Sequence, residues 1–233
     1  MDISQKAIMY IKKNQKKIIA EFIDESKYVS SDKPSSYFMA GSPGAGKTEY
    51  SRRFIEYVEL ETHETIVRID GDEIRQLLPQ YNGHNAYMFQ EAISIGVNKF
   101  YDYVLKKSFS VLIDSTFASC YYAENNVRRS LDKGRIVNIV YIYQDPVKAW
   151  EFTRARALKE GREIPLNVFI RDYFKARENV NNIKKLFGAS IKLTVIRKDY
   201  KNNIQFYKTD VDSIDEHIKD PYDSTSLIAK LRA

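Results

Sequence analysis

The stretch GSPGAGKT, residues Gly41–Thr48, decides the fold. It fits the phosphate-binding pattern G-x-x-x-x-G-K-[ST], in which glycines permit the backbone angles that point several N–H groups at one anion. The apolar stretch Ser36–Ala40 precedes it as a predicted strand, and Glu49–Glu56 continues as a helix whose N-terminus faces the phosphates. A glycine-rich turn without a ligand is the alternative. Strand, loop and helix in this order favour a nucleoside triphosphate site.

Every residue of this loop is a candidate ligand of the nucleotide. The side chain of Lys47 is expected to reach the β- and γ-phosphates, and the hydroxyl of Thr48 is expected to bind Mg²⁺. The expected phosphoryl donor is ATP or GTP. The predicted nucleotide-binding residues are Gly41, Ser42, Pro43, Gly44, Ala45, Gly46, Lys47 and Thr48.

Length and composition indicate an ordinary globular protein. The 233 residues suffice for one large core, with 43% hydrophobic and 29% charged residues. Cys120 is the only cysteine, which excludes a disulfide framework and a thiolate zinc site and fits a reducing cytoplasm. We find no signal peptide and no run of roughly 18 apolar residues, so a cytoplasmic protein without a membrane partner is expected. The net charge of +6 favours anionic ligands.

Apolar runs alternate with amphipathic runs along the chain, which predicts parallel βαβ units. The further strands are expected at Thr65–Ile69, Ser110–Asp114, Ile136–Tyr143, Ile191–Arg197 and, on an edge, Asn203–Thr209. Helices are expected at Phe89–Lys107, Tyr121–Lys133, Val147–Glu160 and Val168–Leu186. The predicted fold class is an α/β P-loop NTPase of the kinase type, a three-layer α/β/α sandwich with a mainly parallel sheet of five or six strands.

The kinase domain is predicted at residues 34–210, with an addition at each end. Residues 1–33 contain an amphipathic helix, Asp2–Ser26, and a linker. Its lysine-rich face is expected to be solvated surface, with a partner-binding or membrane-surface helix as the alternatives. Residues 211–233 are expected to form a polar tail or a helix packed on the domain.

Carboxylates follow two predicted strands, at the edge where such sheets bind ligands. Asp114 ends the strand VLID, the place of a Walker-B carboxylate that holds Mg²⁺ or its water; a helix N-cap is the alternative. Asp70 and Asp72 follow the strand Thr65–Ile69. We predict that Asp72 orients and deprotonates an acceptor hydroxyl with support from Asp70. Either one could instead cap a helix over Glu73–Leu78.

The stretch TRARALKEGREIP, Thr153–Pro165, carries three arginines beside a helix end. Arg154, Arg156 and Arg162 lie around Gly161, which predicts a mobile lid over the phosphates. A guanidinium group matches the charge that spreads over the oxygens of a transferring phosphoryl group. The alternative is that these arginines are ordinary solvated side chains.

Taken together, GSPGAGKT, DGD, DST and ARALKEGREIP resemble the zeta toxin family in order and spacing, over about Pro34–Arg197. Members of that family are kinases that phosphorylate the 3′-hydroxyl of the sugar of UDP-N-acetylglucosamine. A small helical antitoxin holds them inactive. The resemblance implies a nucleotide-sugar-like substrate and an antitoxin partner for this chain.

Residue by residue, the resemblance implies that Asp72 is the catalytic base and Thr116 the threonine on the substrate side. Asp114 stands where the family usually has Glu. Arg162, three residues before a proline, matches the second lid arginine, and Arg156 or Arg154 matches the first.

Two departures concern the acceptor pocket. The family often has an arginine after the acidic-x-Thr motif, whereas Phe117-Ala-Ser follows here. The acidic residue that the family places on the preceding helix falls near Asn98 or Lys99, and neither is acidic. The acceptor is therefore expected to differ from that of the family more than the nucleotide site does.

The sequence thus predicts γ-phosphoryl transfer to a hydroxyl of a nucleotide-like small molecule. The catalytic residues are expected to be Asp72, Lys47, Arg156 and Arg162. Substrate contacts are expected from Asp72, Arg75 and Thr116, and metal contacts from Thr48 and Asp114. The alternatives are a polynucleotide or nucleoside hydroxyl kinase and a nucleotide-dependent switch without an acceptor. A nucleic-acid partner is not expected, because the densest lysines lie on the N-terminal helix and form no continuous basic track to Asp72.

Overall fold

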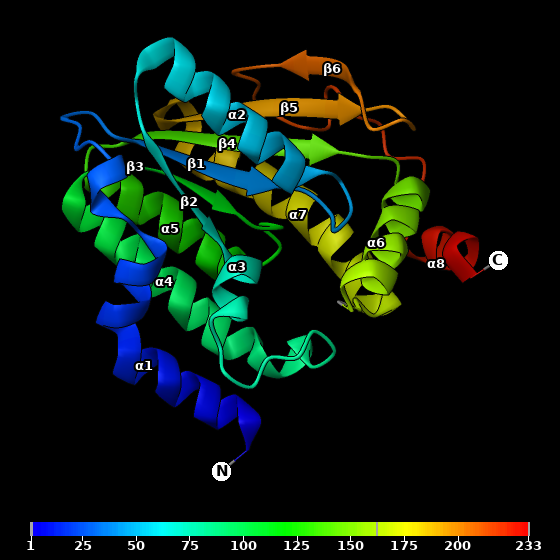
Figure 1. Cartoon of the computed structure of the whole chain (residues 1–233). Coiled ribbons are helices and arrows are strands. Elements are labelled where there is room, and N and C mark those ends of the chain that lie inside the picture. The colour runs from blue at the N-terminus through cyan, green and yellow to red at the C-terminus, as the bar shows by residue number, and fades with distance from the viewer. Residues whose placement is uncertain (1, 162, 233) are drawn as a thin grey trace.

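The structure is a computed structural model that describes residues 2–161 and 163–232, apart from the side chain of Glu160. These residues form one six-stranded sheet with helices on both faces (Figure 1). The strand order is β2-β3-β1-β4-β5-β6; the first five strands in this order run parallel, and β6 is antiparallel to β5. The predicted fold class, a mainly parallel α/β sandwich of the P-loop kinase type, is confirmed.

Where the sequence predicted a range, the helix or strand follows it closely, with two exceptions. The strands are β1 Ser35–Ala40, β2 Ile66–Asp70, β3 Ser110–Asp114, β4 Ile136–Tyr143, β5 Ile191–Lys198 and β6 Ile204–Lys208. The helices are α1 Ile3–Phe22, α2 Lys47–Thr62, α3 Gly71–Gln76, α4 Gln90–Lys107, α5 Cys120–Asp132, α6 Pro146–Glu160, α7 Leu166–Phe187 and α8 Ser224–Arg232. Helix α2 continues past its predicted end at Glu56. Helix α1 stops before the predicted Ser26, because Ile23 is extended and a separate 3₁₀ turn follows.

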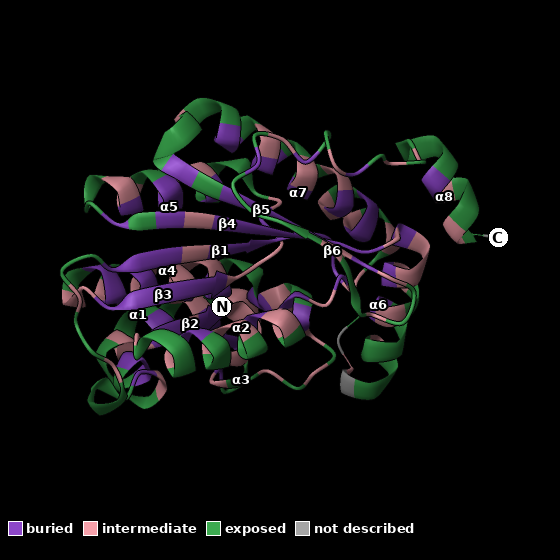
Figure 2. Ribbon diagram, turned by 90° about the horizontal axis from the view of Figure 1, so that it is seen from above, coloured by how far each residue is buried: buried purple, intermediate pink, exposed green. Residues whose placement is uncertain are grey.

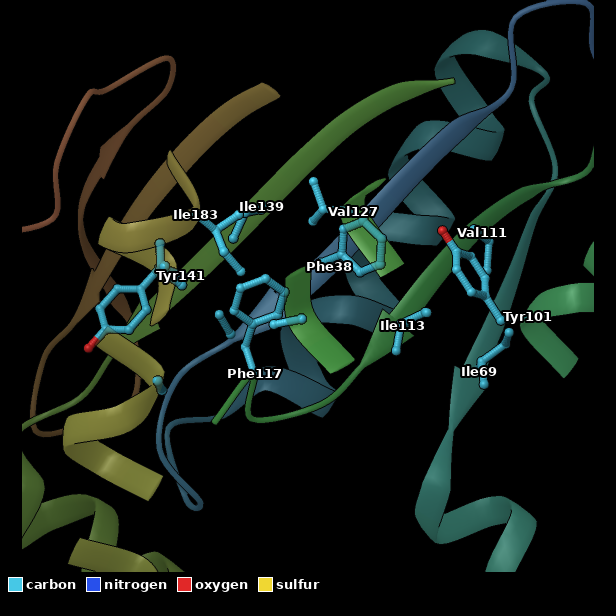
Figure 3. Packing of buried hydrophobic residues seen from close by; sticks show 14 of the residues in the cluster. Phe38, Ile69, Tyr101, Val111, Ile113, Phe117, Val127, Ile139, Tyr141 and Ile183 are labelled. Carbon is cyan, nitrogen blue, oxygen red and sulfur yellow. The ribbon is translucent and has the colours of Figure 1, made fainter. Parts of the chain in front are cut away.

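The parallel strands of the sheet are mostly buried, as expected of such strands, whereas the edge strand β6 is mostly exposed (Figure 2). On one face Phe38, Phe117 and Ile139 pack in a cluster with side chains of α4, α5 and α7 (Figure 3). On the other face Met39 and Leu112 pack under α2. Burying one such side chain stabilises the fold by roughly 1.5–3 kcal/mol. The two clusters fix the position of the loop that joins β1 to α2.

The N-terminal helix and the C-terminal tail share the larger of these clusters. Ala7 and Ile11 of α1 are buried against α4, and the helix turns its lysines to solvent. In the tail, Ile214 and Leu227 are fully buried. The division into residues 1–33, 34–210 and 211–233 stays a prediction, but all three ranges contribute to one core. Across the described chain, no helix has the length and hydropathy needed to span a membrane.

The carboxyl ends of the parallel strands meet at one edge of the sheet. The phosphate loop follows β1, α3 follows β2, and α6 follows β4. At the ends of β2 and β3, Asp70 and Asp114 are paired in register. Ligands of open α/β sheets bind at this edge, and the predicted site residues are concentrated there.

Candidate active site

The loop between β1 and α2 is closed around its own lysine. Lys47 is buried, and its Nζ donates to the carbonyl oxygens of Gly41 at 3.0 Å and Ser42 at 2.7 Å. Gly46 caps α2 in the left-handed conformation, with φ of 79°. The ammonium group thus lies inside the ring of backbone that would surround a phosphate.

Gly44 fixes this loop against α6. Its φ is +72°, and a Cβ atom there would lie 2.0 Å from the carbonyl oxygen of Ala149 and 2.6 Å from Oγ1 of Thr153. No side chain fits between the two segments. The loop and the first turns of the predicted lid helix are therefore in direct backbone contact.

Asp70 and Asp72 have different roles. Asp70 is the N-cap of α3, and its Oδ1 accepts from the N–H of Asp72 at 2.8 Å. The cap interpretation is thereby correct for Asp70, while Asp72 lies in the first turn of the helix. The capping bond orients the backbone of Asp72, and its carboxylate is left to interact elsewhere.

Among the residues that the structure describes, Arg75 and Arg156 hold the carboxylate of Asp72. Arg75 Nη1 donates to Oδ1 at 2.7 Å, and Arg156 Nη2 lies 3.4 Å from Oδ2. The Arg75 guanidinium also lies over the ring of Tyr81, 5.9 Å from its centre. Burial lowers the pKa of Arg75. The side chain of Asp72 keeps 21% of its surface exposed, so it remains accessible from one side.

That accessible side faces a cavity of about 400 Å³, within the usual range for small-molecule sites. Arg75, which was expected to bind substrate, lines this cavity and also donates to Asp72; its side chain is 4% exposed. Tyr81 and Asn82, which come from the loop after α3, were not among the predicted site residues. The cavity is lined by Asp72, Arg75, Gln76, Tyr81, Asn82, Gly83 and Arg156.

The structure separates the two candidates for the first lid arginine. Arg156 lines the cavity and contacts Asp72, whereas Arg154 is exposed and is not among the lining residues. Gly161 ends α6, and a Cβ atom there would lie 3.0 Å from the ring of His84. The loop after α3 therefore touches the end of α6. Arg162 lies outside the described residues.

Thr116 contacts the phosphate loop through its backbone. Its carbonyl oxygen accepts from the N–H of Gly41 at 3.2 Å, and its hydroxyl oxygen accepts from Ala118 N–H at 3.4 Å. Phe117, in the place of the family's frequent arginine, is buried with φ of 62°, and its carbonyl oxygen accepts from Asn179. This position therefore supplies core packing and no charge.

The two candidate metal ligands differ in how well they fit Mg²⁺. Thr48 is half-buried at the start of α2, where its hydroxyl fits the expected role. Asp114 does not fit a direct ligand, because its side chain is 4% exposed and its Oδ2 accepts from Arg68 at 2.7 Å. Elsewhere in the described residues, no group of three or more His, Cys, Asp or Glu side chains is arranged to hold a metal.

This fold and loop define an α/β protein of the P-loop kinase class. Residues 19–212 match the zeta toxin family, and the chain belongs to that family. The match extends beyond the range over which the sequence motifs resemble the family, at both ends. No curated protein sequence matches the chain.

Solved structures of low sequence identity share the fold. A chain of the PezAT chromosomal toxin–antitoxin system of Streptococcus pneumoniae is 16% identical, with a TM-score of 0.65, over 85% of this chain and 81% of that one. A chain of the AvrRxo1-ORF1:-ORF2 complex with ATP is 12% identical, with a TM-score of 0.62, over 99% of this chain and 71% of that one. A chain of the Pnkp1/Rnl/Hen1 RNA repair complex is 19% identical, with a TM-score of 0.52, over 66% of this chain and 47% of that one.

Proposed function

We propose that this protein is a phosphotransferase that moves the γ-phosphoryl group of ATP or GTP to a hydroxyl of a nucleotide-sugar-like small molecule. UDP-N-acetylglucosamine is the example that its family implies. The observation that carries the proposal is the Asp72 carboxylate, open to a cavity and flanked by Arg75 and Arg156. A carboxylate at this position can orient an acceptor hydroxyl and accept its proton.

The cationic groups around the cavity suit the charge that develops during transfer. The guanidinium of Arg156 reaches into the cavity from α6, whose first turns touch the phosphate loop at Gly44. This position supports a role for Arg156 in binding oxygens of both donor and acceptor. Lys47 is proposed to move from the loop carbonyls to the β- and γ-phosphates, and Arg162 remains a proposed second lid arginine.

The donor and the metal are inferred from the loop and from a neighbour. The solved AvrRxo1-ORF1:-ORF2 complex with ATP supports a nucleoside triphosphate as donor. The Thr48 hydroxyl would help to hold Mg²⁺, which would supply positive charge to the triphosphate.

We also infer a small protein antitoxin as partner and a cytoplasmic site of action. The toxin–antitoxin system PezAT and the two-protein AvrRxo1 complex support the partner. Co-expression with candidate antitoxins, followed by size-exclusion chromatography, tests this inference.

The transfer assay combines the protein, labelled ATP and Mg²⁺ with a panel of nucleotide sugars and with 5′-hydroxyl oligonucleotides. We expect label in a nucleotide sugar. Label in the oligonucleotides alone would identify a polynucleotide kinase instead, and ATP hydrolysis without any labelled acceptor would favour a switch. Each outcome selects one of the functions that the sequence left open.

The Asp72→Asn variant tests the base. It should abolish transfer and still bind ATP, because the phosphate loop does not use this carboxylate. Asp132→Asn, an exposed change at the end of α5, is the matched control and should retain activity. If Asp72→Asn keeps more than about a tenth of wild-type turnover, a loss under ~1.4 kcal/mol, Asp72 is not the base.

A further inference from the structure

A partly buried arginine lies between the phosphate loop helix and the proposed base. Arg68 comes from β2, and its side chain is 11% exposed. Its Nη2 donates to Oδ2 of Asp70 at 2.5 Å and to Oδ2 of Asp114 at 2.7 Å. Its Nη1 donates to Oε1 of Glu73 at 2.5 Å. One guanidinium group thus joins three carboxylates from β2, α3 and β3.

The same arginine also reaches α2. Its Nε donates to Oγ of Ser51 at 3.2 Å, and that hydroxyl lies 3.0 Å from the carbonyl oxygen of Thr48. Ser51 Oγ is also 3.2 Å from Oδ2 of Asp114. The single proton of the Ser51 hydroxyl serves one of these two acceptors at a time, and the end of β3 lies within hydrogen-bond distance of α2 at Ser51.

The arginine is also connected to the proposed base. Asp70, which pairs with Arg68, caps the helix by accepting from the N–H of Asp72. Glu73, the next residue after Asp72, accepts a hydrogen bond from Nη1 of the same guanidinium group. A substitution of Arg68 would therefore disturb the backbone of Asp72 through both Asp70 and Glu73.

The charges favour a fixed guanidinium here. Although burial opposes the charged form, the carboxylates of Asp114, Asp70 and Glu73 together raise the pKa of Arg68. The guanidinium group of an arginine donates several hydrogen bonds in fixed directions, and the three carboxylates lie where these bonds point. Mg²⁺ demands near-octahedral oxygen ligands and keeps several waters. A carboxylate that is nearly closed to solvent and already accepts from a guanidinium does not offer such a place.

We propose that Arg68 is the cationic partner of Asp114, and that the pair positions the phosphate loop helix and Asp72 in place of a metal contact from Asp114. This inference rests on the proposed kinase function. Thr48 is then the residue among these that contacts the metal, and Asp114 acts through Arg68 and Ser51. Both Arg68 and Asp114 are positioning residues, since neither touches the reacting atoms.

Two measurements test the proposal. The first is the dissociation constant of Mn²⁺, followed by electron paramagnetic resonance, in the presence of a non-hydrolysable ATP analogue. Removing a partner of a metal site typically costs 10–100-fold in metal affinity. We expect Thr48→Val to lose at least about tenfold, and Asp114→Asn to stay within about threefold of wild type. A tenfold loss in Asp114→Asn would make Asp114 a metal contact and overturn the proposal.

The second measurement is a double-mutant cycle in transfer activity with Asp114→Asn and Arg68→Gln. Residues that act as one unit are non-additive, so the double variant should be no slower than the slower single variant. Arg68→Lys keeps the charge without the fork and should recover part of the activity. Additive losses would show that the two residues act separately and would overturn the pairing.

The two measurements also distinguish a failure of this inference from a failure of the proposed kinase function. Wild-type protein that labels no acceptor contradicts the kinase proposal, whereas the Mn²⁺ comparison still decides the role of Asp114. Should Arg68→Gln fail to fold, Asp114→Asn leaves the arginine paired with Asp70 and Glu73 and carries the test alone.

Discussion

The contact between Gly44 and α6 gives a prediction that can be worked out in numbers. Gly44→Ala adds a Cβ atom at φ +72°, 2.0 Å from a backbone oxygen and 2.6 Å from a side-chain oxygen of α6. A non-glycine residue in the left-handed region costs roughly 1–2 kcal/mol. Overpacking against a backbone that cannot rotate away adds about 1–3 kcal/mol.

Gly134→Ala is the matched control, because Gly134 has a similar φ of +66° and nothing within 4 Å of the added atom. The control variant has the backbone strain of the left-handed conformation but no steric clash. In both variants alanine also lowers the conformational entropy of the unfolded chain, which stabilises the fold by roughly 0.4–1 kcal/mol. The difference in free energy of unfolding should therefore be about 1–3 kcal/mol in favour of Gly134→Ala.

Urea unfolding followed by circular dichroism measures this difference directly. In a chain of this size, 1 kcal/mol corresponds to about 2–4 °C in Tm, so a thermal scan should separate the variants by about 2–12 °C. Gly44→Ala should also weaken ATP binding, since the loop must move to relieve the clash. Equal losses of stability in the two variants would refute the contact between the loop and α6.

Three further predictions concern single side chains. Arg156→Ala should lower turnover by at least about a hundredfold, towards the range of arginine fingers, whereas Arg154→Ala should leave it nearly unchanged in the same assay. Lys47→Ala should weaken ATP binding by about tenfold or more in calorimetry, because one buried ammonium then no longer reaches the phosphates. Burial lowers the pKa of Lys198, which donates to the carbonyl of Gly46. Wild type should therefore gain free energy of unfolding as pH rises from that lowered pKa towards about 10.5, and Lys198→Met should lack the gain when urea unfolding is compared at two pH values.

Local patterns were sufficient to predict most of the fold. The phosphate loop, the five parallel strands and the helices between them each have a sequence signal within a short window, and the structure places them in nearly the predicted ranges. The packing of the C-terminal tail was harder to predict. Its composition is polar, yet Ile214 and Ile218 lie one helical turn apart and both are buried. That spacing was the available signal.

The site was predicted less completely, because its contacts join residues far apart in the chain. In the sequence, Arg68 is one residue of a predicted apolar strand. Its hydrogen-bond partners include Ser51 and Asp114, which lie far away in the chain, so no short window of sequence could show the network. An arginine inside a buried strand was the one hint. Tyr81 and Asn82 lie in a loop between helices, where periodicity gives no guidance.

The strand order has a consequence for how the protein is made. Both neighbours of β1 come later in the chain, since β3 begins at Ser110 and β4 ends at Tyr143. A nascent chain therefore contains the phosphate loop long before the strands that hold β1 in the sheet. Ribosomes add about 5–20 residues per second, so roughly 5–20 s separate the synthesis of Thr48 from that of Tyr143. The loop can take its binding shape only after that interval, which delays the first catalytically competent molecule until most of the chain has been translated.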